Sequence, residues 1–324
     1  MKKNLALVAG GYQSEAVVSY KSAEQVAKML DSEKFNIYII HITKENWLLK
    51  NYEEDIEINK NDFSFEYQGQ KTTFDFSFVI IHGTPGEDGK LQAYFEMLNI
   101  PCSTGNFFNM ALTFNKYACK QYLKNYNIHM AKSVILRKGQ KYNAEEIISE
   151  LGLPMFVKPN QAGSSFGISK VKSINELPSA INNAFSEDNE IIIEEFLEGT
   201  EVTCGVLKTK EKEYLLPLTE IVSKNEFFDY EAKYTTGMAE EITPARITAD
   251  LTKAVQKISS QVYDILDCKG VVRMDYIIRD NQSCFIEVNT VPGMSANSII
   301  PQMIECADIN ISNFLNELIS AQTP

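Results

Sequence analysis

The chain begins with apolar segments separated by an amphipathic one. Leu5–Ala9 is a short apolar run that ends in two glycines, apolar residues then recur at helical spacing over 15–30, and Phe35–Ile42 is a second apolar run. Two buried strands joined by a helix form a βαβ unit, which implies a parallel sheet with helices on its faces. With a further strand at Phe74–Gly83, the pattern predicts an α/β domain that ends near Gly105.

The rest of the chain mixes strands and helices without a regular alternation, which indicates α+β domains. Residues 45–73 show no clear period and receive no assignment. Helices are predicted at 109–126, 144–151, 175–184 and 250–266, and strands at 133–139, 154–160, 168–173, 190–197, 201–208, 214–222, 271–278 and 283–290. We expect three domains, at 1–105, 106–197 and 198–324.

Composition narrows the class of protein. A chain of 324 residues with 44% hydrophobic residues can bury more than one core. A formal net charge of -12 argues against nucleic acid as the main partner. Leu5–Ala9 is too short for the core of a signal peptide, and no apolar window reaches the length of a membrane helix. Six scattered cysteines show no metal-like spacing. We therefore expect reduced thiols in a cytoplasmic protein that acts on neither nucleic acid nor membrane.

Four polar residues lie on the last two predicted strands. Residues two apart in a strand share a face, so Arg273 lies beside Asp275, and Glu287 lies beside Asn289. Pairing of the two strands through a short turn brings the four side chains together. A solvated polar face would also produce this spacing. However, the strands are very apolar, and a buried pair of carboxylates is costly without a cation. Carboxylate and amide oxygens suit Mg²⁺, which also binds nucleotide phosphates.

Two loops and one strand end carry weaker signals. Residues 161–167 form a Gly/Ser loop that can present backbone N–H groups to phosphate, but it fits neither a Walker nor a Rossmann pattern. Lys158, in the apolar strand before it, needs an anion or a route to solvent. Residues 194–201 could bind adenine and ribose at a strand end, although the pattern alone favours an acidic turn. Residues 82–89 form a dense turn after a strand, where α/β folds bind ligands.

Together these motifs resemble the D-alanine–D-alanine ligases of the ATP-grasp superfamily, in family order along nearly the whole chain. The matching segments are AGGYQSE with Glu15, HGTPGEDG (82–89), the helix with Lys116, FVKP with Lys158, GSSFG (163–167), EEFLEGTEVT (194–203), FFDYEAKY (227–234), RMDY (273–276) and EVNTVPGMSANS (287–298). HGTPGEDG, YEAKY and EVNTVPGM are the most specific of them.

The resemblance implies an ATP-grasp architecture behind an N-terminal Rossmann-like domain, and ATP-dependent joining of two D-alanines through an acyl phosphate. It assigns to ATP the residues Lys116, Lys158, Ser165, Glu194, Phe196, Leu197, Glu201 and Lys233. It assigns to two Mg²⁺ or Mn²⁺ ions Asp275, Glu287 and Asn289. It assigns to the amino-acid substrates and the reacting atoms Glu15 (first ammonium), His82, Arg273 and the Gly293 N–H (oxyanion), Ser298 (second carboxylate), and Ser164 and Tyr234 in the closing loops. It also implies a homodimer.

The chain departs from the family at Ala162, where an acidic residue is usual, and the loop 227–241 varies; both affect the lids more than the reaction. Four other readings are possible. A D-alanine–D-lactate ligase often has histidine where this chain has Tyr234. The motifs that contain Glu15 and Ser298 argue against an ATP-grasp ligase that acts on other substrates. A regulator without activity would have lost one of the four hairpin residues. A dehydrogenase would need a different glycine pattern after its first strand.

Overall fold

The computed structural model describes residues 2–12, 15–50, 54–161, 163, 166–223 and 239–323. Its N-terminal sheet has the order β4-β3-β2-β1-β7, with β1 (Lys3–Gly10) parallel to both β2 (Phe35–Ile42) and β7 (Phe76–Val79). Helix α1 (Ala16–Met29) joins β1 to β2, so the βαβ prediction is confirmed. Side chains of β1 are buried from Leu5 onward, as expected of a strand covered on both faces.

The stretch left unassigned in the sequence contains four short strands. They are β3 (Trp47–Leu49), β4 (Ile56–Glu57), β5 (Phe65–Tyr67) and β6 (Gln70–Thr72). Strand β3 extends the N-terminal sheet antiparallel to β2, β4 pairs antiparallel with β3, and the last two strands form a separate hairpin. Strands of two or three residues are too short to show a period, which is why the sequence pattern missed them. Helix α2 (Lys90–Met97) then follows the loop of residues 82–89.

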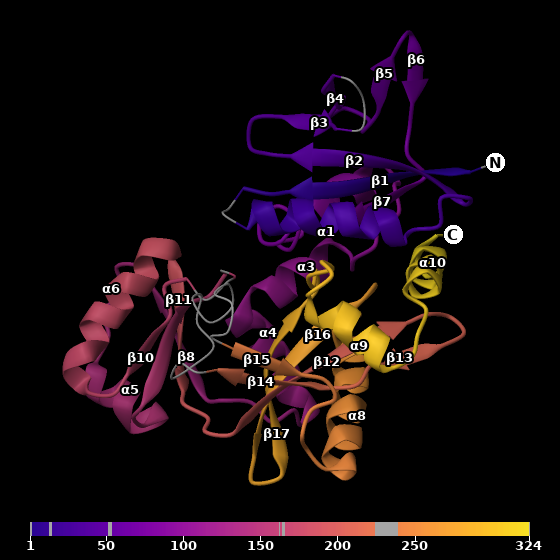
Figure 1. Ribbon diagram of the computed structural model, residues 1–324. Helices are drawn as coiled ribbons and strands as arrows, with labels where there is room; N and C mark the ends of the chain where they lie inside the picture. Colours follow the sequence, from indigo (N-terminus) through magenta and orange to yellow (C-terminus); the bar gives the residue numbers. More distant parts are fainter. Residues whose placement is uncertain are drawn as a thin grey trace.

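A second sheet forms the central part of the chain, at the left of Figure 1. Strands β8 (Ser133–Arg137), β9 (Met155–Pro159), β10 (Ser169–Val171) and β11 (Glu190–Glu195) are antiparallel in the order β10-β9-β11-β8. Helices α5 (Ala144–Leu151) and α6 (Leu177–Glu187), the latter preceded by the 3₁₀ turn η2 (Ile174–Glu176), supply its core, together with inward side chains of the strands. Every residue of that core lies between 134 and 193.

The third sheet has the order β15-β14-β12-β16-β17 and carries most of the predicted chemistry. Its strands are β12 (Thr200–Lys208), β13 (Glu213–Leu215, paired with β12), β14 (Thr219–Ser223), β15 (Ala239–Ile242), β16 (Val272–Arg279) and β17 (Gln282–Asn289). Strand β12 alternates: Val202, Cys204 and Val206 face the core under helix α8 (Ala249–Ile265), so Glu201 and Thr203 face the other way. The strand predicted over 214–222 is interrupted at Pro217, which has no N–H for the ladder.

The helix predicted over 109–126 is broken into α3 (Phe107–Phe114), α4 (Lys116–Leu123) and the 3₁₀ turn η1 (Lys124–Tyr126). Asn115 causes the break. Its backbone is extended, and its side-chain oxygen accepts hydrogen bonds from the Ala118 N–H and from the Asn160 amide, both at 2.9 Å. A second helix therefore starts at Lys116, next to the end of β9. Both helices pack against the third sheet.

The N-terminal and C-terminal parts share one core. Helices α9 (Ile299–Cys306) and α10 (Ile311–Gln322) contribute Met303, Phe314 and Leu318 to the cluster that also contains Leu7 and Val26. Figure 1 accordingly shows α10 beside α1. Within the part of the chain that the structure describes, no helix is long and apolar enough to cross a membrane.

Candidate active site

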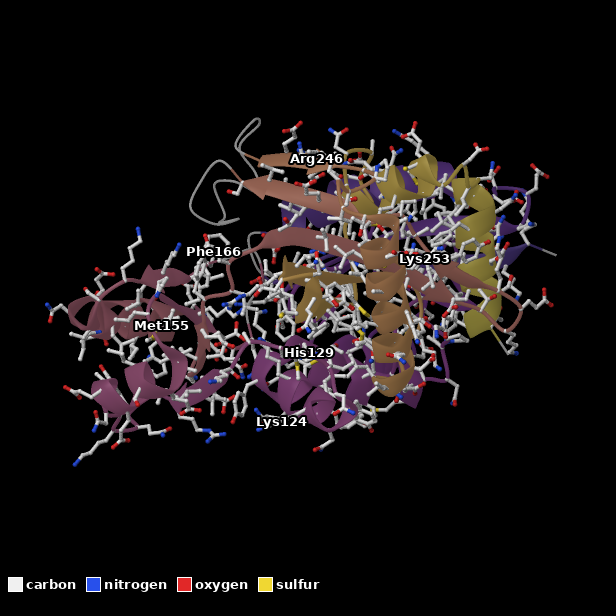
Figure 2. All side chains as sticks on the ribbon, turned by 90° about the horizontal axis from the view of Figure 1, so that it is seen from below. Lys124, His129, Met155, Phe166, Arg246 and Lys253 are labelled. Carbon is white, nitrogen blue, oxygen red and sulfur yellow. The ribbon has the colours of Figure 1, made fainter. Side chains whose placement is uncertain are left out.

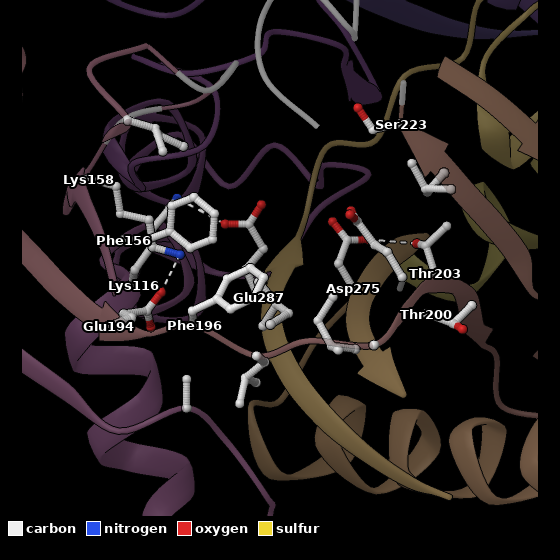
Figure 3. Close-up of a pocket in the computed structure, with 18 of the residues that line it drawn as sticks. Lys116, Phe156, Lys158, Glu194, Phe196, Thr200, Thr203, Ser223, Asp275 and Glu287 are labelled. Carbon is white, nitrogen blue, oxygen red and sulfur yellow. Dashed lines mark hydrogen bonds and ion pairs between the residues drawn. The ribbon is translucent and has the colours of Figure 1, made fainter. Parts of the chain in front are cut away.

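A cavity of about 530 Å³ separates the central sheet from the third sheet (Figure 3). The predicted ATP and metal residues that line it are Lys116, Lys158, Glu194, Phe196, Leu197, Glu201, Asp275 and Glu287, and Arg273 also lies in its wall. Residues more than 150 positions apart in the sequence therefore meet in one place. The size is ordinary for a small-molecule site.

Three lysines stand at one side of this cavity, each paired with a carboxylate. Lys116 lies 3.1 Å from Oε2 of Glu287, and Lys158 contacts Oε2 of Glu194 (Figure 3). Lys120, one turn after Lys116 on α4, contacts the other oxygen of Glu194. Lys116 and Lys158 line the cavity and can bind phosphate oxygens, provided that they exchange their present carboxylate partners for the nucleotide.

Glu194 is ionised although it is buried. Burial acts to raise the pKa of its carboxyl, but the ammonium groups of Lys120 and Lys158 outweigh burial and hold that pKa at about 2. Burial lowers the pKa of Lys120, while Glu194 and Glu287 together raise the pKa of Lys158 despite its burial. The three groups thus form one buried cluster of two lysines around one carboxylate.

The hairpin β16–β17 brings the predicted metal ligands together. Asp275 pairs directly with Glu287, and Arg273 with Asn289, so all four side chains lie on one face. A β-bulge follows Asp275, where the register changes by one residue. Thr203 donates to Oδ1 of Asp275 at 2.6 Å, and Asn289 accepts from the Val291 N–H at 3.1 Å. Two carboxylates that line the cavity, with an amide oxygen on the same face of the hairpin, suit Mg²⁺.

Arg273 is fixed by a two-pronged ion pair. Its Nε and Nη2 each donate to Asp275 at 2.9 Å. Burial acts to lower the pKa of the guanidinium, but Asp275, Glu287 and Glu241 overcome burial and raise it. The arginine therefore offers a permanent positive charge at the edge of the cavity.

Apolar side chains line the cavity next to the lysine cluster (Figure 3). The rings of Phe156 and Phe196 lie 5.8 Å apart, and the ammonium of Lys170 stands 4.1 Å from the centre of the Phe196 ring. Ile277 and Ile286 from the hairpin also line the wall. Apolar side chains beside the carboxylate of Glu194 and the end of strand β11 suit a purine base.

Glu15 and His82, two of the predicted substrate residues, follow the carboxyl ends of β1 and β7 in the N-terminal sheet. A Cβ atom on Gly163 would come within 3.0 Å of the Glu15 carboxylate, so the Gly/Ser loop approaches Glu15 closely. His82 is buried, and its Nε2 has no partner among the described residues. Burial lowers its pKa, against the opposing effects of Glu15 and the Val291 carbonyl, which favours a neutral ring. Burial also raises the pKa of Glu87, whose Oε2 accepts from the Gly83 N–H at 2.6 Å, to about 7.

Gly293 and Ser298 lie together in the loop before α9. A Cβ atom on Gly293 would be 2.8 Å from the Ser298 hydroxyl, so a side chain at 293 would crowd it. That hydroxyl shares a hydrogen bond of 2.7 Å with Ser295. Ser298 is also the N-cap of α9, whose free backbone N–H groups favour a carboxylate.

Four of the residues assigned by resemblance lie outside the described residues: Ser164, Ser165, Lys233 and Tyr234. Sequence reasoning missed Lys120, Glu87 and Thr203. Lys120 had a usable signal, because it is four residues after Lys116 and therefore on the same helical face. Thr203 had a similar one, since it is two residues from Glu201 on a strand.

Comparison with known proteins agrees with this geometry. Residues 4–105 match the family model described as D-ala D-ala ligase N-terminus, and residues 122–320 match D-ala D-ala ligase C-terminus. The D-alanine–D-alanine ligase of Azobacteroides pseudotrichonymphae is 49% identical over 322 residues, covering 98% of this chain and 99% of that relative. The same-named protein of Flavobacterium johnsoniae is 49% identical over 318 residues, covering 98% of each.

Solved structures extend the likeness to the fold. VanG D-Ala:D-Ser ligase from Enterococcus faecalis superimposes with a TM-score of 0.90 at 32% identity, covering 99% of this chain and all of the other. D-alanine–D-alanine ligase from Bacillus anthracis, complexed with ATP, gives a TM-score of 0.78 at 28% identity, covering 99% and 96% of the two chains. The match spans the whole length in each case.

Proposed function

The chain belongs to the D-alanine–D-alanine ligase family, and we propose that it joins two D-alanine molecules into a dipeptide for cell-wall synthesis at the expense of ATP. One observation carries the proposal from geometry. Lys116, at the start of α4, pairs with Glu287 of the β16–β17 hairpin, and Lys158, at the end of β9, lines the same cavity as Glu287 and Asp275. That arrangement can hold a triphosphate against a divalent cation.

Each substrate has a place in the site. We propose that adenine lies between Phe156, Phe196 and the hairpin, with its phosphates toward Lys116 and Lys158. The ammonium of the first D-alanine would meet Glu15, close to neutral His82. The carboxylate of the second would meet Ser298 at the N-terminus of α9.

The reaction follows from the weak electrophilicity of a carboxylate. Lys116 and Lys158 orient the terminal phosphate so that the first D-alanine carboxylate can attack it, which gives an acyl phosphate and ADP. The amine of the second D-alanine then attacks the acyl carbon, and phosphate leaves. Arg273 and the Gly293 N–H stabilise the negative charge that forms on the acyl oxygen. Asp275, Glu287 and Asn289 would hold Mg²⁺ or Mn²⁺, which neutralises phosphate charge when bound.

The approach of Gly163 to Glu15 suggests why water does not intercept the acyl phosphate. A side chain at position 163 would crowd the Glu15 carboxylate, so a glycine there lets the backbone lie close to the proposed site of the first substrate. We further propose the three-domain division at 1–105, 106–197 and 198–324, a homodimer, and a cytoplasmic location consistent with six free thiols. Sedimentation equilibrium measures the oligomeric state directly.

A product assay tests the proposal. Purified protein with ATP, Mg²⁺ and D-alanine should release ADP and phosphate in equal amounts and form a dipeptide with the mass of D-Ala-D-Ala. D-serine and D-lactate, each offered in competition, measure the choice of acceptor, for which we expect D-alanine. AMP and pyrophosphate as products, or phosphate release without any dipeptide, would refute the proposed reaction.

A further inference from the structure

Lys120 is a buried charged group just behind the cavity wall, and the proposed reaction gives it no task. Its side chain is 4% exposed, and that of its partner Glu194 is 5% exposed. Lys158 binds the second oxygen of the same carboxylate and is 11% exposed. Lys158 lines the cavity, whereas Lys120 does not, so only Lys158 can reach a ligand there.

The shared carboxylate creates a conflict once a nucleotide is bound. Phosphate oxygens compete with Glu194 for the ammonium of Lys158. A buried carboxylate that loses its only cation pays a large desolvation penalty, so a lone Glu194 would retain Lys158. A second cation on Glu194 removes that penalty and leaves Lys158 available to phosphate.

We propose that Lys120 is a positioning residue that keeps Glu194 neutralised and thereby releases Lys158 to bind the nucleotide phosphates. This inference rests on the proposed function, because it takes ATP as the ligand. The fold supports it. The cap at Asn115 starts α4 at Lys116 and so points Lys116 and Lys120 from one helical face toward Glu287 and Glu194, respectively. The short helix α4 thus supplies both Lys116, which binds phosphate, and Lys120, which frees Lys158 to do so.

The test separates binding of the base from binding of the phosphates. Dissociation constants for adenosine and for ADP are measured by calorimetry, and their ratio gives the contribution of the phosphates. In Lys120→Met we expect adenosine to bind as in the native protein, while the phosphate contribution falls roughly 10- to 100-fold, the worth of one charged hydrogen bond. Lys120→Arg should retain most of it.

A second substitution shows whether Glu194 traps Lys158. Adding Glu194→Gln to Lys120→Met removes the competing charge, so the phosphate contribution should return to within a few fold of the native value. Using the ADP-to-adenosine ratio cancels any effect of Glu194 on the base. Lys124→Met is the matched control, since Lys124 is exposed at the end of α4, on the outer surface in Figure 2, and should change nothing.

A merely structural Lys120 would give a different result. Equal weakening of adenosine and ADP in Lys120→Met, or no recovery in the double variant, would overturn the inference. A native ratio near one would mean that phosphates contribute nothing, which would overturn the inference and the nucleotide site together. A product assay on native protein that yields dipeptide while the variants bind ADP normally would overturn only the role of Lys120.

Discussion

The ion pair that Glu287 makes in this structure differs from the contact that the proposed reaction gives it. It pairs with Lys116 at 3.1 Å, yet the reaction needs Lys116 at a phosphate and Glu287 at a metal ion. Both exchanges require the negative charge of the carboxylate, so Glu287→Gln should leave folding intact and lower kcat at least about 100-fold, equivalent to roughly 3 kcal/mol of transition-state stabilisation.

Steady-state rates at saturating ATP and D-alanine, together with circular dichroism, measure this effect. Glu305→Gln provides the control, because Glu305 is exposed on α9. A Glu287→Gln variant with near-native kcat would remove Glu287 from the metal site while leaving the family assignment in place.

Because Glu87 is buried, its carboxyl should make the free energy of unfolding depend on pH. Burial raises its pKa from 4.5 to about 7. Below pH 4.5 the carboxyl is protonated whether the chain is folded or unfolded, so it has no effect. Between pH 4.5 and 7 the unfolded chain loses the proton and the folded chain keeps it. The folded state is therefore progressively destabilised as pH rises, and the full cost is present above pH 7.

The variant Glu87→Gln should accordingly be more stable than the native protein at pH 8 and nearly equal to it at pH 4. Urea unfolding at the two pH values measures the difference, and Glu66→Gln, at an exposed position, serves as control. The same difference at both pH values would show that the effect comes from packing and not from ionisation.

For single residues, the sequence predicted which side chains belong to the site better than it predicted which side chains contact one another. The two-residue period placed Arg273 beside Asp275 and Glu287 beside Asn289, and the register confirms that they share a face. It could not reveal that Lys116 pairs with Glu287, because that contact joins a helix to a sheet. It also could not reveal that Lys158 pairs with Glu194, because that contact joins two strands of the central sheet that are not consecutive along the chain. A period describes one element only; contacts across a cavity depend on how elements pack.

Helices and strands were predicted well where burial is periodic, and less well where a single side chain determines where an element ends. Strand β2 and helix α5 have the predicted bounds, because their apolar spacing is regular. The break at Asn115 depends instead on a hydrogen bond with Asn160, 45 residues away. Positions 214–222 were predicted as one strand although Pro217 lies within them, so this error could have been avoided from the sequence alone.

The loop between α8 and β16 carries a testable constraint on the packing of the N-terminal sheet. Gly270 has φ +69°, and a Cβ atom there would lie 1.9 Å from the backbone oxygen of Ser103. The Ser103 hydroxyl in turn accepts from the Val79 N–H of β7 at 2.9 Å. Gly270→Ala should therefore push two elements apart, and we expect a loss of about 1–3 kcal/mol beyond the strain of a left-handed backbone.

Gly139→Ala isolates that strain, because Gly139 has φ +84° and nothing within 4 Å of its Cβ position. Chemical denaturation of the two variants gives the difference in their free energies of unfolding. Equal losses would mean that the Ser103 contact relaxes at no cost.

The whole molecule has separate cores, and their membership predicts how it unfolds. The core of the central sheet draws only on residues 134–193, whereas one continuous core joins the N-terminal sheet to α9 and α10. In Figure 2 the central part, with Met155, accordingly projects to one side of the rest. The nucleotide cavity lies between the two bodies, so bound ADP would link their stabilities.

Cores that share no residues can unfold in separate steps. We expect calorimetry without ligand to show two transitions. Ile181→Ala, in the central core, should lower the temperature of one transition, and Leu318→Ala, on α10, should lower that of the other. Each substitution should reduce the free energy of unfolding by the roughly 2–5 kcal/mol typical of such truncations. ADP with Mg²⁺ should bring the transitions together, because it binds only where both bodies are folded. Hydrogen exchange read by mass spectrometry assigns each transition to its residues. If both variants shifted a single transition equally, the chain would be one cooperative unit, and closure of the cavity would have to come from its loops and not from motion of the central part.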